Sequence, residues 1–417
     1  MKFETIIIGA GLAGVSAAIR LAEQGKDVAL ISAGRSAMHF NSGSLGLLGF
    51  DNNHQPVSSP VEAVESLPDS HPYKRLEAAS LTEFADNAAD LLRRAGVKTV
   101  GNVRENHMRI TPLGLCRPAW LTLEQVVTLD ALKQLERPHV AIVGIAGFLD
   151  FYPRFIAAAL EKEGFRCDLL TVDNPDLQRL RKSETEMRAA NIARIMEGEA
   201  LTRFGESVRD VSSDSEAAAL ILPAVVNFDG DGESLHLRQI VGRDLFYAPT
   251  MGVSIPGIAM HTRLMRHFLT LGGRLFNGHR VVSAEFNDDS LVAVYTDKLD
   301  DDALRADNFI FAGGSFFSRG LVATPDEVIE PIFNLDTLAP SDRSKWFDSD
   351  LFGVQPVMNS GIAVDHTFRA LRSGVPVKNL YAVGSSLAGA DSLSNDSGAG
   401  VALLTAIAVA DRIIKLQ

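Results

Sequence analysis

Three glycines near the start of the chain, Gly9, Gly11 and Gly14, have the spacing of a turn that binds phosphate. They follow an apolar run at residues 6–8 and precede an alanine-rich run at residues 15–24, which predicts a strand, a tight turn and a helix. Gly9 would allow the turn, Gly11 would let a phosphate approach the backbone, and Gly14 would let the helix pack against the strand. The free N–H groups of the helix would face the anion. The alternative is an ordinary turn that needs glycine for its backbone angles.

The residue after the second predicted strand departs from the dinucleotide-binding pattern. That strand covers residues 28–31, and Ser32 follows it. The pattern places Asp or Glu about 20 residues beyond the glycines, where the carboxylate holds an adenosine ribose. The nearest acid, Asp27, precedes the strand. We therefore expect the phosphate of a cofactor to be held better than its adenosine half, which leaves room for a mononucleotide.

A loop of small and polar residues at positions 35–46 follows this strand. Ser42, Gly43 and Ser44 carry hydroxyl and backbone groups that could contact a phosphate or the edge of a ring. A solvated turn would have the same composition, so both interpretations stay open.

Further glycine turns occur late in the chain. Gly313 and Gly314 follow an apolar run at residues 308–311. Gly384 follows another predicted strand, and Asp391 is a candidate partner for ribityl hydroxyls or a turn cap. The remaining candidates, Gly398 and Gly400, precede a long apolar helix, whose N-terminal N–H groups would stabilise an anionic ring by about 0.3–1 kcal/mol. A plain helix start is the alternative for these two glycines.

Composition narrows the class of protein. The net charge of −12, from 40 basic and 52 acidic residues, gives no sign of nucleic-acid binding. Cys116 and Cys167 are the two cysteines, too few for a disulfide framework or a four-thiolate iron–sulfur cluster. We expect no metal site.

No signal peptide is recognisable, and the apolar run at residues 399–414 is interrupted by Asp411 and too short to span a membrane. We expect a cytoplasmic protein.

The order of these segments predicts an α/β fold with an insertion. Residues 1–55 and 256–417 would form one Rossmann-like FAD/NAD(P)-binding domain from the two ends of the chain. Residues 56–255 would form a large inserted α/β domain. We expect that domain to serve as a scaffold, with a second nucleotide site as the alternative.

The chain resembles the two-domain flavoproteins of the succinate dehydrogenase and fumarate reductase type. The first glycine turn, the turn at Gly313 and the region from Gly384 to Gly400 carry this resemblance. More narrowly, the sequence is similar to the B subunits of anaerobic glycerol-3-phosphate dehydrogenases. The similarity rests on residues 36–45, 111–114, 191–194, 313–318 and 320–323.

This resemblance implies oxidation of sn-glycerol 3-phosphate to dihydroxyacetone phosphate. It implies FMN as the cofactor, with FAD as second choice. The implied partners are a sister flavoprotein and an iron–sulfur protein, the A and C subunits of such complexes. Electrons would continue to quinone, and the chain would meet the inner face of the membrane only through this complex. The missing acid at Ser32 agrees with FMN, and the lack of cluster cysteines agrees with iron–sulfur centres elsewhere.

Oxidation of such a substrate requires a base for the hydroxyl proton and cations for the phosphate. We expect His39 to be the base, and His261, Arg263 and Arg319 are the candidates for the cations. Each of them could instead have a structural role. Two alternatives stay open: a flavoprotein that only relays electrons or supports the complex, without catalysis, and a related FAD-dependent oxidoreductase with another substrate.

Overall fold

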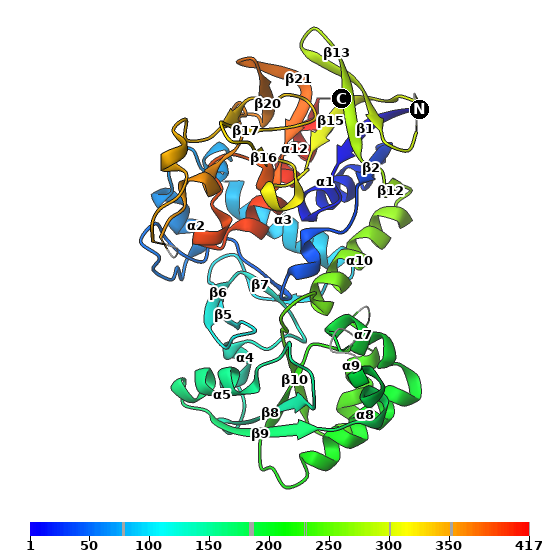
Figure 1. The fold of residues 1–417 in the computed structure, drawn as a ribbon, viewed down its shortest axis with the longest axis vertical. Helices are drawn as coiled ribbons and strands as arrows, with labels where there is room; N and C mark the ends of the chain where they lie inside the picture. The colour runs from blue at the N-terminus through cyan, green and yellow to red at the C-terminus, as the bar shows by residue number, and fades with distance from the viewer. Residues whose placement is uncertain are drawn as a thin grey trace.

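The computed structural model describes residues 1–76, 80–182, 187–228, 230, 232–299, 302–350 and 353–416. Figure 1 shows two bodies stacked along the long axis of the molecule. The upper body contains both chain termini, and the lower body is built from the middle of the chain. The expected α/β fold is confirmed.

The upper body is built on an eight-stranded sheet that joins the two ends of the chain. Strands β1 (Lys2–Ile8) and β2 (Val28–Ser32) pair in parallel. Strand β1 also pairs in parallel with β15 (Leu304–Phe311), and β15 pairs in parallel with β21 (Val375–Ala382). The predicted strands all lie in or overlap strands of the structure. The order along the sheet is β12 (Arg274–Asn277), β2 (Val28–Ser32), β1 (Lys2–Ile8), β15 (Leu304–Phe311), β14 (Ser290–Thr296) and β13 (Val281–Asn287), with β21 (Val375–Ala382) beside β15 and β20 (Arg369–Arg372) beside β21.

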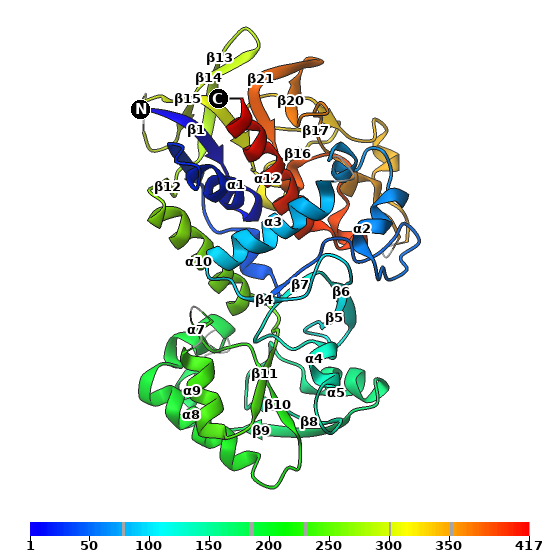
Figure 2. The same ribbon diagram turned by 180° about the vertical axis from the view of Figure 1, so that it is seen from behind.

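Helix α12 (Gly398–Lys415) forms the centre of the helical layer of the upper body. It packs against α1 (Leu12–Ala22) and α3 (Leu81–Arg94), and Figure 2 shows the three helices side by side. Asp411, which interrupts the apolar run of α12, pairs with Arg20 of α1 at 2.6 Å (Oδ1 to Nε). This ion pair explains how a charge is accommodated on a helix buried along most of its length. None of the helices in the described ranges is long and apolar enough to cross a membrane.

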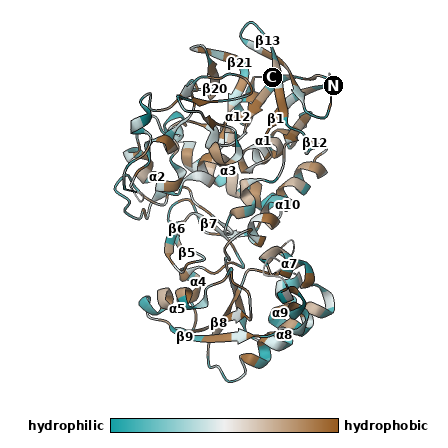
Figure 3. Cartoon of the chain, viewed as in Figure 1, coloured by the Kyte–Doolittle hydropathy of each residue, from teal (hydrophilic) through white to brown (hydrophobic). Residues whose placement is uncertain are grey.

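The lower body contains a second, wholly parallel sheet. Its strand order is β11 (Asp244–Ala248), β10 (Ala219–Pro223), β8 (His139–Ile145) and β9 (Arg166–Val172). Helices α5 (Pro153–Lys162), α8 (Gly198–Val211) and α9 (Gly232–Val241) accompany it. The central strand β8 is buried along its whole length, whereas the edge strand β9 is partly exposed, and Figure 3 shows the helices as mixed in hydropathy, as expected for amphipathic helices beside a buried strand. The strand order reverses between β8 and β10.

Two chain segments connect the bodies and lie side by side. In residues 123–128, the backbone N–H of Val127 donates to the carbonyl of Tyr247 (2.9 Å), and the N–H of Tyr247 donates to Gln125 (3.0 Å). Residues 249–254 then lead into α10 (Ile255–Thr270). A Cβ on Gly43 (φ +93°) would lie 2.9 Å from Val126 Cγ2 and 3.0 Å from Pro256 Cβ. Gly43 therefore packs against the first connection and against the start of α10, which follows the second.

Short elements complete the chain. The strands are β3 (Ser44–Leu45), β4 (Thr99–Val100), β5 (His107–Ile110), β6 (Cys116–Ala119), β7 (Leu121–Leu123), β16 (Val322–Ala323), β17 (Val328–Ile329), β18 (Thr337–Leu338) and β19 (Gly361–Ile362). The short helices are α2 (Pro60–Ala63), α4 (Leu129–Lys133), α6 (Pro175–Gln178), α7 (Ala189–Ile195) and α11 (Ser392–Asn395). Strand β7 pairs with β3 and β4, and β5 pairs with β6, so these five strands form two small sheets, whereas α3, from the same part of the chain, packs on α12.

The buried side chain of His71 makes stability depend on pH. His71 is 1% exposed, and its Nδ1 accepts a hydrogen bond from Tyr73 N at 3.2 Å. Burial, together with the charges of Lys74 and Arg75, lowers the pKa of His71 to about 4. Below pH 6.5 the unfolded chain therefore binds a proton that the folded chain rejects, and stability decreases as the pH drops from 6.5 towards 4.

We predict that a His71→Asn variant loses this dependence. The amide oxygen of Asn can accept the same hydrogen bond but does not titrate. Between neutral pH and pH 5, the free energy of unfolding of the wild-type chain should fall by about 2 kcal/mol more than that of the variant. Denaturant unfolding at a series of pH values measures the difference. If the free energy of unfolding changes equally with pH in the wild-type chain and the variant, His71 does not have the lowered pKa.

Candidate functional site

A cavity of about 530 Å³ opens where β1, β2 and β15 end, and we call it the glycine-turn cavity. The carboxyl ends of parallel strands are where α/β sheets bind ligands. Of the predicted cofactor residues, the cavity is lined by Gly9, Gly11, Ser32, Gly313, Gly314 and Gly398. The structure thus brings together segments from both ends of the chain. The expected ligand contacts of these residues stay predictions.

The three glycines of the first turn have different surroundings. A Cβ on Gly9 (φ +108°) would lie 2.2 Å from the Ala312 carbonyl oxygen, and one on Gly14 would lie 1.8 Å from the Gly9 oxygen. A Cβ on Gly11 would meet only Ser36 Oγ, at 3.8 Å. Gly9 and Gly14 are therefore needed for packing, whereas Gly11 faces open space at the N-terminus of α1. This is a cradle that a side chain would fill and that a phosphate fits.

The N-terminus of α12 also borders the cavity. Gly398 and Ala399 line the cavity, and no side chain caps the helix at Ser397. Gly400 packs instead: its N–H donates to Gly46 O at 2.8 Å, and a Cβ would lie 2.1 Å from the Tyr73 hydroxyl oxygen. The first N–H groups of α12 therefore face the cavity with the positive end of the helix dipole.

The other predicted cofactor residues lie outside the lining of this cavity, Gly384 and Asp391 among them. Gly384 (φ +70°) packs against Ala13, because a Cβ would lie 2.8 Å from the Ala13 Cβ. Asp391 caps α11, where its carboxylate accepts hydrogen bonds from Leu393 N and from Ser394 N and Oγ. Ser32, which does line the cavity, donates its hydroxyl to Gly34 O at 3.1 Å.

A second cavity of about 380 Å³ adjoins the first between the two bodies, and we call it the Arg109 cavity. It shares with the first cavity the residues Phe40, Asn41, Ser392, Gly398 and Ala399. Its other walls are Ser42, Ser44, Gly46, Arg109, Thr111, Pro112, Thr250 and Asp396. A ligand in the second cavity would therefore lie directly beside a ligand in the first, over the N-terminus of α12.

Two arginines surround one carboxylate in this second cavity. Arg109 Nη2 donates to Asp396 Oδ2 at 2.9 Å, and its Nη1 donates to Ser42 Oγ at 3.3 Å. Arg117 Nε lies 3.5 Å from the same Asp396 oxygen, and its guanidinium lies 4.4 Å from the centre of the Phe50 ring. Because one carboxylate faces two guanidinium groups, this cluster has a net positive charge and suits an anionic ligand.

A buried chain of polar groups leads away from the Arg109 cavity. Ser44, which is 7% exposed, accepts a hydrogen bond from Thr122 Oγ1 at 2.9 Å, and Thr122 lies 2.7 Å from His107 Nε2. His107 Nδ1 is buried without a hydrogen-bond partner. Thr250, which is 6% exposed at the end of β11, also has a buried hydroxyl without a partner. A polar ligand in the cavity could satisfy Thr250.

The predicted base, His39, pairs with His261 behind the glycine turn. His261 Nε2 donates to Ala10 O at 2.8 Å, so its Nδ1 accepts from His39 Nε2 at 3.2 Å. The pKa of each imidazole is lowered, mainly by burial, so the pair is neutral at neutral pH. Neither ring is among the residues that line the two cavities. The structure therefore places this pair as a support for the turn.

Arg263 and Arg319, the two arginines expected to bind phosphate, lie outside both cavities. Arg263 Nη1 donates to Gly96 O at 2.6 Å and its Nη2 donates to Phe228 O, which ties the upper body to the lower one. Arg319 is exposed at the end of a 3₁₀ turn, with φ +62°. The sequence analysis did not identify Arg109. The one sequence feature that pointed to it is its position two residues before 111–114, a segment that carries the resemblance to the B subunits.

We predict that Gly11→Val prevents cofactor binding without unfolding the chain. The valine would occupy the space that a flavin phosphate needs, while its Cβ meets no backbone atom. Flavin absorbance of the purified variant should be lost, and its unfolding temperature should match that of a flavin-free wild-type sample. Gly25→Ala, at a glycine with open surroundings and positive φ, is the control that should keep its flavin. A folded Gly11→Val variant that retains flavin would show that the phosphate lies elsewhere.

Comparison with protein families identifies the nucleotide-binding part of the chain. Residues 4–401 match the family described as FAD binding domain. The match supports a flavin cofactor and names FAD, so it does not support our expectation of FMN ahead of FAD. Among solved structures, E. coli quinol fumarate reductase FrdA covers the whole chain, which in turn covers 70% of FrdA, with 10% identity and a TM-score of 0.45.

Curated relatives match along their whole lengths. The B subunit of the anaerobic glycerol-3-phosphate dehydrogenase of Yersinia pestis bv. Antiqua (strain Antiqua) is 42% identical over 420 residues, which cover 99% of this chain and 98% of the relative. The protein of the same name from Pectobacterium atrosepticum is 38% identical and covers the whole chain and 99% of the relative. The chain therefore belongs to the family of anaerobic glycerol-3-phosphate dehydrogenase B subunits and contains an FAD-binding domain.

Proposed function

We propose that this chain is the flavoprotein subunit that oxidises sn-glycerol 3-phosphate to dihydroxyacetone phosphate within an anaerobic glycerol-3-phosphate dehydrogenase complex. The observation that carries the proposal is the position of the Arg109 cavity. It adjoins the glycine-turn cavity over the N-terminus of α12, and the two share five lining residues. A substrate in one would contact a cofactor in the other, as hydride transfer requires.

The cofactor of the proposal is FAD. The glycine-turn cavity continues past Gly11 to Ser32, Ala33, Gly34 and Arg35, the place of the adenosine half in dinucleotide folds. Gly11 and the N-terminus of α1 would hold the phosphates, and the N-terminus of α12 would face the carbonyl edge of the ring. When bound, the flavin supplies the hydride acceptor. Acid release and mass measurement of the flavin distinguish FAD from FMN.

Arg109 would bind the phosphate of the substrate. Its guanidinium lines the cavity, and Asp396 and Ser42 fix its orientation. Arg117 neutralises the remaining charge of Asp396, so the positive charge of Arg109 stays available to an anion. An arginine held in this way pairs with phosphate through two hydrogen bonds.

The buried chain from Ser44 to His107 would accept the hydroxyl proton. For this relay both hydroxyls would rotate, so that Ser44 donates to Thr122 and Thr122 donates to an unprotonated Nε2 of His107. Ser44 would then take the substrate proton and pass its own to Thr122, and Thr122 would pass its proton to His107 Nε2. Hydroxyl groups can both donate and accept, so each keeps one proton throughout. Burial lowers the pKa of His107, Asp130 raises it and Arg109 lowers it, so the imidazole is neutral and able to act as a base at neutral pH.

The electrons would leave through partner proteins. The relatives are named as subunits, and within the described residues no cluster of His, Cys, Asp or Glu could hold a metal ion. We propose a sister flavoprotein, an iron–sulfur protein and quinone as the successive partners, the first two being the A and C subunits of the complex. The complex would lie on the cytoplasmic side and contact the membrane through one of these partners.

One observation favours electron relay without substrate oxidation as a second candidate. Phe40 (57% exposed) lines both cavities and makes an edge-to-face contact with Phe317 (70% exposed), with ring centres 5.7 Å apart. Exposed aromatic side chains beside a cofactor cavity are typical of a surface that another protein covers. Replacement of Arg109 separates the two candidates.

We predict that Arg109→Gln impairs substrate binding and leaves the flavin in place. Loss of a charge-assisted hydrogen-bond pair should raise the KM for glycerol 3-phosphate about 10- to 100-fold in the reconstituted complex. Arg319→Gln is the matched control, because it removes the same charge from an exposed position outside both cavities. Unchanged kinetics of Arg109→Gln in a complex with full flavin content would favour the relay function.

We predict that His107→Gln and Thr122→Val lower kcat about 100-fold without changing KM, as expected for loss of a proton acceptor. Because the pKa of His107 is lowered, wild-type kcat should fall when the pH drops below 6.5. This acidic decline should disappear in His107→Gln. Thr122→Ser retains a hydroxyl and should retain activity. An acidic decline that persists in His107→Gln would assign the base to another group.

A further inference from the structure

The carbonyl of Ala10 lies between two glycines of the first turn, and a side chain outside the glycine-turn cavity holds it. His261 Nε2, on α10, donates to Ala10 O at 2.8 Å, and His261 is not among the residues that line the cavity. The peptide that joins Ala10 to Gly11 is trans. Its C=O and its N–H therefore point in opposite directions within one plane. Because His261 holds the carbonyl on the side of α10, the N–H of Gly11 points to the opposite side, towards the cavity.

The N–H of Gly11 is available to a ligand. Within the described residues, no backbone carbonyl accepts a hydrogen bond from it. The N–H of Gly9, by contrast, donates to Ile31 O at 2.9 Å. A Cβ on Gly11 would meet only Ser36 Oγ, at 3.8 Å, so an oxygen can approach this part of the backbone. The direction of the Gly11 N–H therefore decides how well the turn can hold a phosphate.

His39 fixes the tautomer of His261. A neutral imidazole carries its proton on one nitrogen and can accept a hydrogen bond at the other. Burial lowers the pKa of both rings, so each carries one proton at neutral pH. His39 Nε2 lies 3.2 Å from His261 Nδ1 and donates to it. This bond keeps the proton of His261 on Nε2, where it faces the carbonyl of Ala10.

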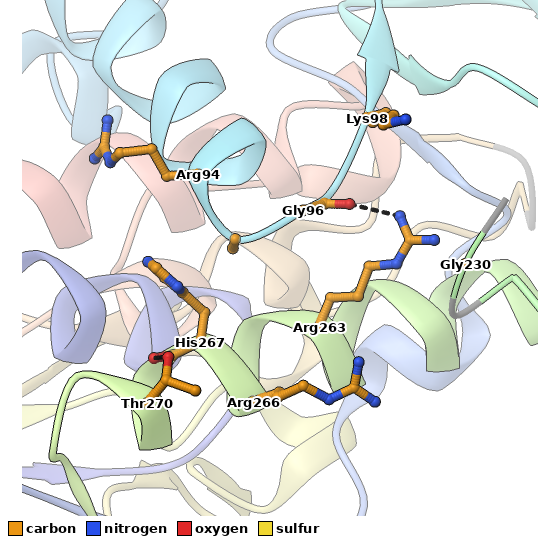
Figure 4. Close-up of a pocket in the computed structure, with 9 residues that line it drawn as sticks. Arg94, Gly96, Lys98, Gly230, Arg263, Arg266, His267 and Thr270 are labelled. Atoms are coloured by element: carbon orange, nitrogen blue, oxygen red, sulfur yellow. Dashed lines mark hydrogen bonds between the residues drawn. The ribbon is translucent and has the colours of Figure 1, made fainter.

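Helix α10 holds both histidines rigidly at the junction between the bodies. The N–H of Ser254, the residue before α10, donates to the carbonyl of His39 at 2.7 Å. Two residues beyond His261, Arg263 donates to Gly96 O at 2.6 Å, the bond drawn in Figure 4. The imidazole that contacts the glycine turn is thus carried by a helix that is fixed on both sides of it.

We propose that His261 is a positioning residue for the cofactor and that His39 acts through it. His261 sets the direction of the Gly11 N–H, and hence the strength with which the turn holds a flavin phosphate, without contacting the cofactor. The inference rests on the proposed placement of the phosphate at Gly11. It goes beyond that placement because it assigns part of the affinity for the phosphate to a side chain outside the cavity.

The test is calorimetric titration of the flavin-free, full-length chain with FAD and, separately, with riboflavin, which has no phosphate. In His261→Leu, the Kd for FAD should rise about tenfold, because the turn loses a hydrogen bond, and the Kd for riboflavin should stay unchanged. His261→Gln, whose amide N–H reaches the same position, should restore the affinity for FAD. A His39→Leu, His261→Leu double variant should bind FAD as His261→Leu does, because His39 acts through His261.

His267→Leu is the matched control. It removes an imidazole from the same helix, at a position that Figure 4 shows on the wall of a separate hollow, and it should bind both flavins as the wild-type chain does. The proposal is overturned if folded His261→Leu binds FAD normally, if it loses riboflavin in the same proportion, or if His261→Gln binds FAD as weakly as His261→Leu. A wrong placement of the phosphate is recognised separately, because Gly11→Val would then retain its flavin.

Discussion

The close approach of three backbone segments at the first glycine turn determines the rest of the site. A Cβ on Gly9 would overlap the carbonyl of Ala312, and one on Gly14 would overlap the carbonyl of Gly9. The end of β1, the start of α1 and the end of β15 can therefore meet only without side chains. Their meeting forms one wall of the glycine-turn cavity and places the N-terminus of α1 against it. Larger residues would push these elements apart and remove the anion-binding surface.

The same constraint explains why the two ends of the chain form one domain. Strand β15 lies beside β1, and α12 packs across α1 in the same body. The N-termini of α12 and α1 therefore both border the cavity, so that two helix dipoles converge on one space. Such convergence suits a ligand with a phosphate at one end and an electron-accepting ring at the other. The ion pair between Arg20 and Asp411 maintains this arrangement.

The lower body contributes to the chemistry by completing the second cavity. Thr250 stands at the end of β11, whereas Arg109 and Ser42 lie on small sheets and loops of the upper body. The cavity exists only where these segments meet. The bodies are joined by two adjacent connections and by Arg263, so small movements between them would change the distance from Thr250 to Arg109.

The sequence by itself determined the local elements and the nucleotide-binding turn, because strands, helices and glycine turns depend on residues close in the chain. It also located Gly11, Gly313 and Gly398, each at the end of a strand or the start of a helix. The partners of Arg109 could not be derived in this way, since Asp396 lies 287 residues away and the contact arises from tertiary packing. Likewise, only the tertiary structure placed His39 behind the turn and Arg263 between the bodies, because a side chain's role depends on which distant backbone atoms it meets.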